Sequence, residues 1–580
     1  MDDKKIFLAL GFHVNYNHSW RGDRNDRTGF GLDSQVIEGI LDILDRTNAK
    51  GIPAQGTWDF DNYWSIESIM KNYAPELLER IVERVTQGPD EAILDAWNNG
   101  MLGACTTEEF RETLSRTISN SGGSGIKDLF GAFPPVVRTQ ETMFTQGSVE
   151  LFLEQGVEAI CLYYSSIPFD AIRNFVRRLS PNEMFNPLWL NSTESDARMK
   201  MIPMYSQGDI VNNGSIKKWV KKIRRHQEAG KIPGNALVYI NMDADGEIWT
   251  GLPLPKILEK LPNSRGLPEF IETVQELDYL EFTSLGDYIE NNQPVGELTV
   301  RQDLADGSHS GYNSWTEKEE NHRLWRISER ARRFAQFARH TAESAADDAT
   351  KETILSEIRA PEDSWFEHKL RLLSTTHFGM HSPAVHYERA QVGFHFARSA
   401  LDRASSAAHA AARLLPPPAP ASDADPLFTF TIAGFPRYAG ETPPPPGARS
   451  LVRVPFGPVE TDLAPEQVDL FGPDNSPVPF DFETVTTADG KMSGVLLVLH
   501  TAGDTPRTDY TLAPSRLSPG EPAVTATENT LTNGKIIMRL DSRGRIRSLV
   551  MDDEEYSSQQ LLTLGATYRT EKSRKFFTPR

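Results

Sequence analysis

Seven short apolar runs recur through the first 300 residues, and they constrain the fold more than any other feature of the sequence. Between them lie stretches such as Ser34–Arg46 and Pro75–Val85, in which apolar residues are spaced by three and four, as in an amphipathic helix. Strands that are apolar on both faces and alternate with helices predict a parallel α/β fold. The runs are Ile6–Phe12, Gly51–Trp58, Ala92–Trp97, Val136–Glu141, Ala159–Tyr164, Met201–Tyr205 and Leu237–Met242.

A barrel suits these runs better than a doubly wound sheet. No glycine-rich phosphate loop follows the first run, as it would in a dinucleotide-binding fold. Seven strands in one continuous stretch also match a closed ring. We therefore predict an α/β fold with a seven-stranded (β/α) barrel over residues 1–305.

The character of the sequence changes after the barrel. Residues 306–415 are rich in Arg, Glu and Ala, which predicts a helical bundle, and residues 416–427 read as a Pro-rich linker. Short alternating runs broken by Pro and Gly predict a small β domain over 428–520 and the start of a larger β-sandwich over 521–580. A hairpin near Gly544 is followed by a basic tail, Arg569–Arg580, without evident partner strands, so we expect a piece of a longer protein.

Composition excludes several classes of protein. The formal net charge is −19, which disfavours a nucleic-acid binder because phosphate binding needs a basic face. No apolar stretch approaches the roughly 20 residues of a membrane span, and the apolar run after Lys5 is too short for a signal peptide. The only two cysteines, Cys105 and Cys161, read as reduced, packed thiols. We predict a cytoplasmic protein that binds neither nucleic acid nor a membrane.

Two acidic residues each stand at the end of an apolar run. Glu141 closes the run that begins at Val136, and Asp243 closes the run that begins at Ala236. Carboxyl ends of barrel strands carry the active site in enzymes of this architecture, and two carboxylates there are what a glycoside hydrolase uses. The alternative is that both are ordinary polar residues at strand ends.

Other candidate residues follow the first three runs. His13 follows the first and is either a site residue or a satisfied core histidine. Trp58 and Asp59 mix an aromatic ring with a carboxylate, as sugar sites do, and an equal alternative for Trp58 is a hydrophobic contact with the next helix. Asp95 and its neighbour Trp97 repeat the pattern more weakly.

These residues resemble a clan that unites glycoside hydrolase family 57 (amylases, branching enzymes) with family 38 (α-mannosidases). Phe12–Asn15 is similar to the clan's first-strand His motif, and Gln140–Thr142 to the nucleophile motif of family 57. Asp243–Gly246 resembles the proton-donor segment, with Asp245 where the family has Glu. Asn313–Trp315 resembles a substrate loop, and the bundle with its β domains resembles family 38.

The resemblance implies a retaining glycoside hydrolase or transglycosylase that acts on α-linked sugars in an oligo- or polysaccharide. Glu141 would be the nucleophile and Asp243 the acid and base, while His13, Trp58, Asp59, Asp95, Asp245 and Trp315 would bind substrate. We expect no cofactor. Two readings stay open: a zinc enzyme of the α-mannosidase kind, with His13, Glu141 and His377 around the metal, and an inactive carbohydrate-binding protein. A homo-oligomer is also open, because large members of the clan commonly associate.

A polysaccharide deacetylase is a further alternative with a similar barrel. It needs an Asp-Asp pair near the first strand and an His-x-x-x-His motif, and neither is evident here.

Overall fold

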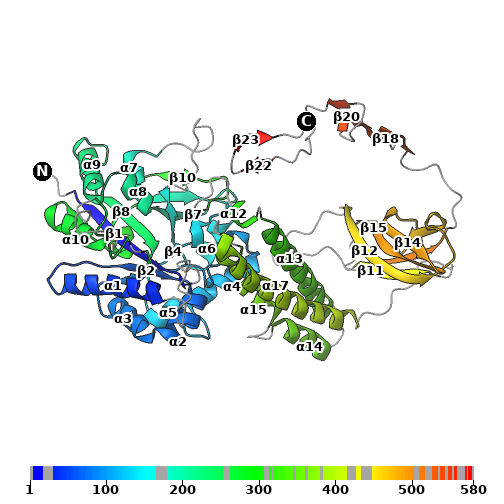
Figure 1. Ribbon diagram of the computed structural model, residues 1–580, viewed down its shortest axis with the longest axis horizontal. Helices are drawn as coiled ribbons and strands as arrows, with labels where there is room; N and C mark the ends of the chain where they lie inside the picture. The colour runs from blue at the N-terminus through cyan, green and yellow to red at the C-terminus, as the bar shows by residue number, and fades with distance from the viewer. Residues whose placement is uncertain are drawn as a thin grey trace. The chain divides into compact units, whose positions relative to one another are not determined.

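The computed structural model divides into two compact units, residues 1–416 with 436–443 and residues 417–435 with 444–580 (Figure 1). It describes residues 4–16, 31–164, 179–246, 248–251, 262–305, 313–316, 318–343, 348–359, 364–378, 383–413, 426–432, 447, 449–501, 508–515, 525–532, 536–541, 546–551, 554–557, 568–570 and 573–577.

Seven parallel strands of the first unit form a closed ring. They pair in the order β1 (Ile6–Val14), β2 (Thr57–Phe60), β3 (Glu91–Ala92), β4 (Val136–Arg138), β5 (Ala159–Tyr163), β7 (Arg198–Tyr205) and β8 (Ala236–Asp243), and β8 returns to β1. Leu94, just after β3, links β3 to β4: its N–H donates to Val136 at 3.0 Å, and its carbonyl accepts from Arg138 at 2.8 Å. Each strand lies within or beside one of the seven predicted runs, so the predicted barrel is confirmed.

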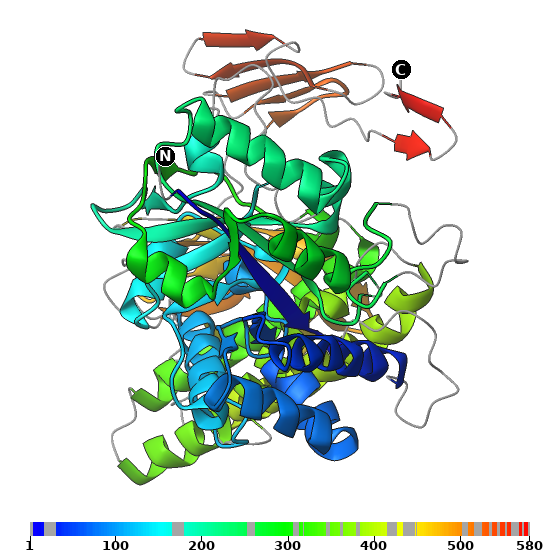
Figure 2. The same ribbon diagram turned by 90° about the vertical axis from the view of Figure 1, so that its left-hand side faces the viewer.

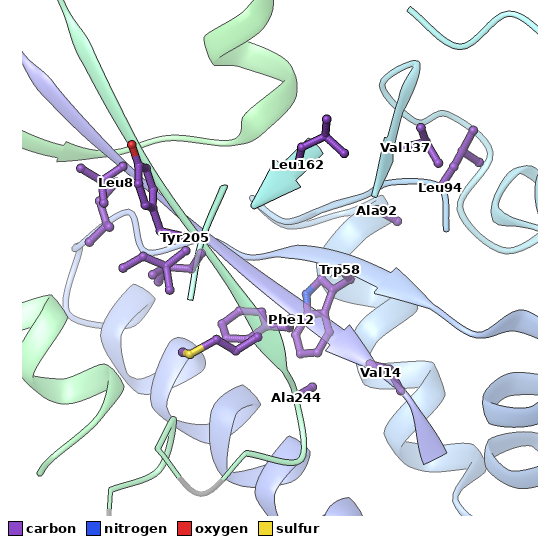
Figure 3. Close-up of a cluster of buried hydrophobic side chains, with 14 of the residues drawn as sticks. Leu8, Phe12, Val14, Trp58, Ala92, Leu94, Val137, Leu162, Tyr205 and Ala244 are labelled. Atoms are coloured by element: carbon purple, nitrogen blue, oxygen red, sulfur yellow. The ribbon is translucent and has the colours of Figure 1, made fainter. Parts of the chain in front are cut away.

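The alternation of side chains gives each strand two buried faces. Ala9, Ile202 and Leu237 belong to a core inside the ring. Residues of the opposite parity, such as Phe12 and Trp58, lie in the larger core between strands and helices (Figure 3). A strand that is buried on both sides must be apolar throughout, which explains the continuous runs.

Helices cover the outside of the strands (Figure 2). The helices and helical turns of this part of the chain are α1 (Gly31–Asn48), η2 (Asn62–Met70), α2 (Lys71–Tyr73), α3 (Pro75–Thr86), η3 (Leu102–Ala104), α4 (Thr107–Ile118), α5 (Ile126–Phe130), η4 (Gln140–Thr142), α6 (Ser148–Glu154), α7 (Pro181–Met184), α8 (Gln207–Asn212), α9 (Ile216–Glu228) and α10 (Leu267–Glu276).

The amino-terminal end of the ring is closed. β6 (Leu188–Asn191) and β10 (Glu297–Thr299) extend the sheet beyond β7, and β9 (Leu280–Phe282) pairs with the start of β1. Helix α11 (Leu285–Asn291) then places Leu285, Tyr288 and Ile289 in the inner core. Its first two N–H groups donate to the carboxylate of Glu91 at 2.5 and 2.9 Å. Helix α11 therefore covers the amino-terminal end of the ring, and the carboxylate of Glu91 there is satisfied by its hydrogen bonds.

A helical bundle follows in the same unit. It contains α12 (Asn313–Thr316), α13 (Glu319–Glu343), α14 (Asp348–Arg359), α15 (Trp365–Leu372), α16 (Thr375–Phe378) and α17 (Pro383–Ala412). Buried alanines on α13 and α17, such as Ala335 and Ala404, let the two long helices pack together. Helix α4 contributes the buried carboxylate of Glu109, which accepts from Arg332 at 2.8 Å and lies 3.9 Å from the ammonium of Lys369. This ion network joins the barrel to the bundle.

The second unit contains antiparallel sheets. β11 (Phe428–Ile432), β16 (Thr508–Pro514) and β13 (Val468–Phe471) form one sheet, and β12 (Arg449–Glu460), β15 (Lys491–Thr501) and β14 (Phe480–Ala488) form another. The short turn η6 (Pro465–Gln467) precedes β13. Both sheets contribute to one core that contains Phe430 and Leu496, which makes this part a small sandwich.

The last described strands also pair. β17 (Thr525–Ala526), β18 (Thr530–Thr532), β19 (Ile536–Leu540), β20 (Ile546–Met551) and β21 (Glu554–Ser557) form one sheet, which includes the predicted hairpin. The expectation that the basic tail lacks partner strands is wrong, because β22 (Tyr568–Thr570) pairs with β23 (Ser573–Phe577).

Two other sequence features can be compared with the structure. Both cysteines are free thiols, and Cys161 is buried in the inner core, as expected. Among the described residues, no helix combines the length and the apolar character that crossing a bilayer requires.

Candidate active site

Four charged side chains are buried together at the carboxyl end of the barrel. His13 is the last residue but one of β1, Asp59 lies opposite it on β2, Asp95 follows β3, and Arg138 ends β4. All four are at most 4% exposed. Their positions have the parity that points into the ring, so the fold itself brings them together.

His13 links the two carboxylates. Its Nδ1 lies 2.5 Å from Oδ1 of Asp59 and 3.4 Å from Oδ2 of Asp95. Burial is the largest influence on the pKa of His13 and lowers it, and Arg138 lowers it further. The charges of Asp59 and Asp95 outweigh both, so the pKa of His13 is raised above its usual value. The imidazole is therefore held in its cationic form over a wider pH range than a free histidine.

Arg138 is the permanent cation of the cluster. Its Nε lies 3.8 Å from Asp59 and its guanidinium is 3.5 Å from Asp95. Burial opposes its charge, but the two carboxylates hold its pKa well above the ordinary value. The same guanidinium donates to Oε1 of Gln140 at 3.0 Å, which ties the charged cluster to the turn that carries Glu141.

Two of the carboxyl groups favour protonation. Burial raises the pKa of Asp95 to about 7, against the lowering effect of His13 and Arg138. Burial likewise raises the pKa of Asp61 well above its usual value, and the charge of Asp95 adds to this effect. Asp61 caps η2 by accepting from the N–H of Trp64 at 3.2 Å. The site therefore holds protons that surface carboxyl groups would have lost near neutral pH.

Asn241 of β8 completes the buried ring of polar groups. Its amide donates to Oδ2 of Asp59 at 2.8 Å, and Tyr163 donates to its backbone carbonyl at 2.9 Å. Gly11 makes this arrangement possible, because a Cβ there would lie 2.4 Å from the amide nitrogen of Asn241. The glycine in β1 thus provides room for a cross-strand hydrogen bond beneath His13.

Glu141 lies in a strained turn directly after β4. Its φ is 51° and ψ is 24°, and Thr142 has a φ of 47°. Left-handed backbone at non-glycine residues costs about 1–3 kcal/mol and is concentrated at functional sites. Phe144 holds the turn through a two-way backbone bridge with Leu304, at 3.1 and 2.9 Å. The side chain of Glu141 is only partly buried, in contrast to the charged cluster.

Asp243 ends β8 in register with His13. The N–H of Ala244 donates to the carbonyl of His13 at 2.7 Å, and the indole of Trp249 donates to the carbonyl of Asp243 at 3.1 Å. The charge of Asp243 reaches Arg138 on β4 and contributes to its raised pKa. Like Glu141, Asp243 is partly exposed, so both acids occupy the accessible layer of the same end of the barrel.

Several polar atoms of the cluster have no hydrogen-bond partner among the described residues. They are Nε2 of His13, Oδ2 of Asp61, Oδ2 of Asp95, Nε of Arg138 and Oδ1 of Asn241. Buried polar atoms are nearly always satisfied in folded proteins. A group of donors and acceptors of this kind suits a ligand with several hydroxyl groups.

Three predicted site residues lie outside the cluster. Trp58 is fully buried between strands and helices, 4.8 Å from Phe12 between ring centroids, and its indole donates to Asp90 (Figure 3). Its contacts match the alternative interpretation, a core residue. Trp315 is buried among apolar residues such as Met143 and Phe378. Asp245 is partly buried, and its charge acts on Tyr16.

The zinc set that family 38 would imply does not fit these residues. Asn15 stands where that family has an acid, and its side-chain oxygen accepts from Asn99 at 2.6 Å. His377 is buried with a pKa lowered to about 4, and its Nδ1 lies 3.1 Å from the carbonyl of Leu372. Within the described ranges, the one close group of potential ligands is His13, Asp59 and Asp95, without Glu141 or His377.

Arg138 and Asn241 were missed because they lie inside apolar runs. The alternation of side chains along a strand could have identified them. Arg138 lies two positions after Val136 and Asn241 two positions after Tyr239, so each shares the inward face of its strand with a residue of the inner core. A charged residue in a run that is otherwise apolar on both faces indicates the polar end of a barrel interior.

No protein-family model and no curated protein matches this chain. Among solved structures, it is similar to an α-mannosidase from Enterococcus faecalis V583, with a TM-score of 0.54 and 11% identity over 95% of this chain and 61% of that one. A family 38 glycosyl hydrolase from Enterococcus faecalis gives 0.48 and 12% over 96% and 60%. A 4-α-glucanotransferase from Thermococcus litoralis gives 0.43 and 11% over 92% and 85%.

The first of these neighbours is an α-mannosidase, and α-mannosidases belong to the clan that the sequence resembles; the likeness concerns the fold. This chain spans 61% of the length of the first α-mannosidase. The architecture predicted from the resemblance is confirmed: over 95% of its length the chain has the fold of the Enterococcus faecalis α-mannosidase.

Proposed function

We propose that this chain is a retaining α-glycosidase, or a related transglycosylase, with Glu141 as nucleophile and Asp243 as acid and base. The observation that carries the proposal is the two-layered carboxyl end of the barrel. Two partly exposed acids lie at strand ends there, above a buried cluster that contains His13, Asp59 and Arg138. The fold shared with an α-mannosidase supports the same class of reaction.

The reaction divides between the two acids. The carboxylate of Glu141 attacks the anomeric carbon while the carboxyl group of Asp243 protonates the departing oxygen, and this gives a glycosyl ester on Glu141. Asp243, now ionised, removes a proton from water or from an acceptor hydroxyl, which attacks the anomeric carbon and releases Glu141. Water gives hydrolysis, and a sugar hydroxyl gives transfer.

The buried cluster would orient the sugar. Nε2 of His13 and Oδ1 of Asn241, which have no hydrogen-bond partner among the described residues, offer a donor and an acceptor to hydroxyl groups of the ring. Arg138 steadies the turn of Glu141 through Gln140, at 3.0 Å. The nucleophile and the groups that bind the sugar hydroxyls would then be fixed on the same end of the barrel. This lowers the entropy that the bound substrate must lose to reach the transition state.

The test is the release of 4-nitrophenol from a panel of 4-nitrophenyl α-glycosides, beginning with the α-mannoside because of the structural neighbour. Wild type should hydrolyse at least one member. Glu141→Gln, which keeps the size of the side chain, should lower kcat by at least about 10³-fold, as loss of a catalytic nucleophile does. Glu150→Gln is a matched control on the neighbouring helix α6, and should retain the wild-type rate.

Two results would oppose the proposal. Full activity in Glu141→Gln would show that another group attacks the sugar. Silence of the wild type on the whole panel and on α-linked polysaccharides, with binding of those polysaccharides retained, would instead favour a carbohydrate-binding protein without catalysis.

A further inference from the structure

The buried cluster at the carboxyl end of the barrel poses a problem of charge. Asp59 and Asp95 are both buried and lie close to His13, and the potential ligand atoms of these three residues all lie within 4.8 Å of one another. Two carboxylates and an imidazole at this spacing form a set that binds Zn²⁺ or Mn²⁺ in many proteins. In this chain a cation is already present among them.

Arg138 supplies that cation. It approaches Asp59 at 3.8 Å and Asp95 at 3.5 Å, so one guanidinium spans both carboxylates. Arginine stays protonated in proteins and suits buried carboxylate pairs better than lysine does. Its charge lies where a divalent ion bound by the same carboxylates would be repelled.

The state of His13 points the same way. A histidine ligand must be neutral and present a lone pair to the metal. Nδ1 of His13 instead faces Oδ1 of Asp59 at 2.5 Å, so that nitrogen is already engaged with a carboxylate. Adding a divalent ion to a buried group that already contains the guanidinium of Arg138 beside both carboxylates would leave an excess of positive charge without solvent.

We propose that Arg138 is a built-in substitute for a metal ion: it bridges Asp59 and Asp95 and keeps the site of this chain free of divalent metal. The inference concerns the site of the proposed glycosidase, but its readout is metal binding and does not require activity. The same guanidinium also donates a hydrogen bond to Gln140, the residue before Glu141.

The experiment measures metal uptake directly. Wild type, Arg138→Met and Arg138→Lys are stripped with a chelator, loaded with ZnCl₂ or MnCl₂, passed through a desalting column and assayed for bound metal by mass spectrometry. Isothermal titration with ZnCl₂ gives the affinity. Arg138→Met should take up about one metal ion per chain more than wild type, and zinc should raise its melting temperature. Arg138→Lys should resemble wild type, because it keeps a cation.

A double variant locates the extra ion. Arg138→Met combined with Asp95→Asn should lose the additional metal, while Arg138→Met combined with Asp42→Asn, a surface carboxylate, should keep it. Uptake of one metal ion by wild type that disappears in Asp95→Asn would overturn the inference. So would Arg138→Met that folds and binds no more metal than wild type, or that fails to fold even when zinc is present. A metal-free wild type that lacks glycosidase activity would oppose the proposed function and leave this inference intact.

Discussion

Nδ1 of His13 lies 2.5 Å from Oδ1 of Asp59, across the β1–β2 ladder in which the two residues are direct partners. The carboxylate fixes the orientation of the ring, so Nε2 keeps a constant, buried position at the carboxyl end of the barrel. No described residue hydrogen-bonds to that Nε2. The hydrogen bond to Asp59 therefore holds Nε2 of His13 in one orientation, which suits the recognition of a sugar hydroxyl.

Asp59→Asn should destabilise the first unit. The substitution removes the negative charge that faces both His13 and Arg138, and breaking a buried ion pair costs about 3–5 kcal/mol. All ten tryptophans lie between Trp20 and Trp365, so tryptophan fluorescence during guanidinium unfolding reports on the first unit alone. Asp42→Asn is the control: its pair with Arg80 at 2.9 Å is exposed, and such pairs contribute about 0–1 kcal/mol. Equal losses in the two variants would contradict the assignment.

Asp95 should make stability depend on pH. Its pKa is about 7 in the folded chain and near 3.8 when unfolded, so the folded state binds more protons between these values. Stability from this group is therefore greatest at the acidic end and falls as the pH rises towards 7, with a limiting slope of about 1.4 kcal/mol per pH unit. The raised pKa of His13 acts in the same direction, with loss as the pH rises beyond 6.5.

Melting temperatures measured across that window test this prediction. The advantage of wild type over Asp95→Asn should shrink steadily as the pH increases from about 4 to 7. Because only the change with pH is compared, any constant cost of placing an amide at this position cancels. Parallel curves for the two proteins would show that Asp95 titrates normally.

Trp58→Ala should act on stability and leave sugar binding alone. The side chain is fully buried and contacts Phe12, so its truncation should cost about 3–5 kcal/mol of unfolding free energy. Trp58→Phe should lose less, because it keeps an aromatic ring in the same core. A rise in KM for the best glycoside without loss of stability in Trp58→Phe would restore the original prediction that Trp58 stacks on a sugar.

Glu109→Gln should weaken the attachment of the bundle to the barrel. Burial raises the pKa of Glu109, but the charges of Lys369 and Arg332 on either side lower it more, so it lies below the usual value. Removal of its charge leaves the buried ammonium of Lys369 without its close carboxylate and leaves Arg332 with Glu329 as its remaining ion-pair partner, at a cost of about 3–5 kcal/mol. Glu112→Gln, on the same helix, disrupts a half-exposed pair with Arg116 and should cost about 0–1 kcal/mol. Both losses are measurable by the same fluorescence-detected unfolding.

The barrel was predictable because each of its strands and helices leaves a recognisable pattern of apolar residues in a short stretch of the sequence. Each strand is buried on both faces, so each appears as a short continuous apolar run, and the helix between two runs shows its own period. Ala236–Asp243 matches its predicted run almost residue for residue. The pairing of β22 with β23 was missed because these strands are short and polar, and only their antiparallel contact distinguishes them from an unpaired tail.

The site was predictable only in part. His13, Asp59 and Asp95 were identified because they follow apolar runs, and the structure brings them together. Arg138 lies inside a run, and its pairing with carboxylates from two other strands depends on closure of the ring. That contact is not present in any local stretch of sequence.

Alternation explains why Trp58 lies in the core between strands and helices and outside the charged cluster. It precedes Asp59 on β2, and consecutive strand residues point to opposite faces, so both could not face the interior. Trp315 was assigned to the site through a resemblance. Its burial could not be predicted from the sequence, because its neighbours Met143 and Phe378 come from distant segments that only the tertiary fold brings together.

The covalent state of Glu141 tests the central claim most directly. The protein is incubated with an activated 2-deoxy-2-fluoro or 5-fluoro glycoside of the sugar that it hydrolyses best, which slows release of a glycosyl enzyme, and then digested for mass spectrometry. We predict one added glycosyl unit per chain, on the peptide that contains Glu141, and none in Glu141→Gln. A glycosyl unit on another residue, or turnover of the natural glycoside with inversion at the anomeric carbon and no labelling, would contradict the assignment of Glu141 as nucleophile.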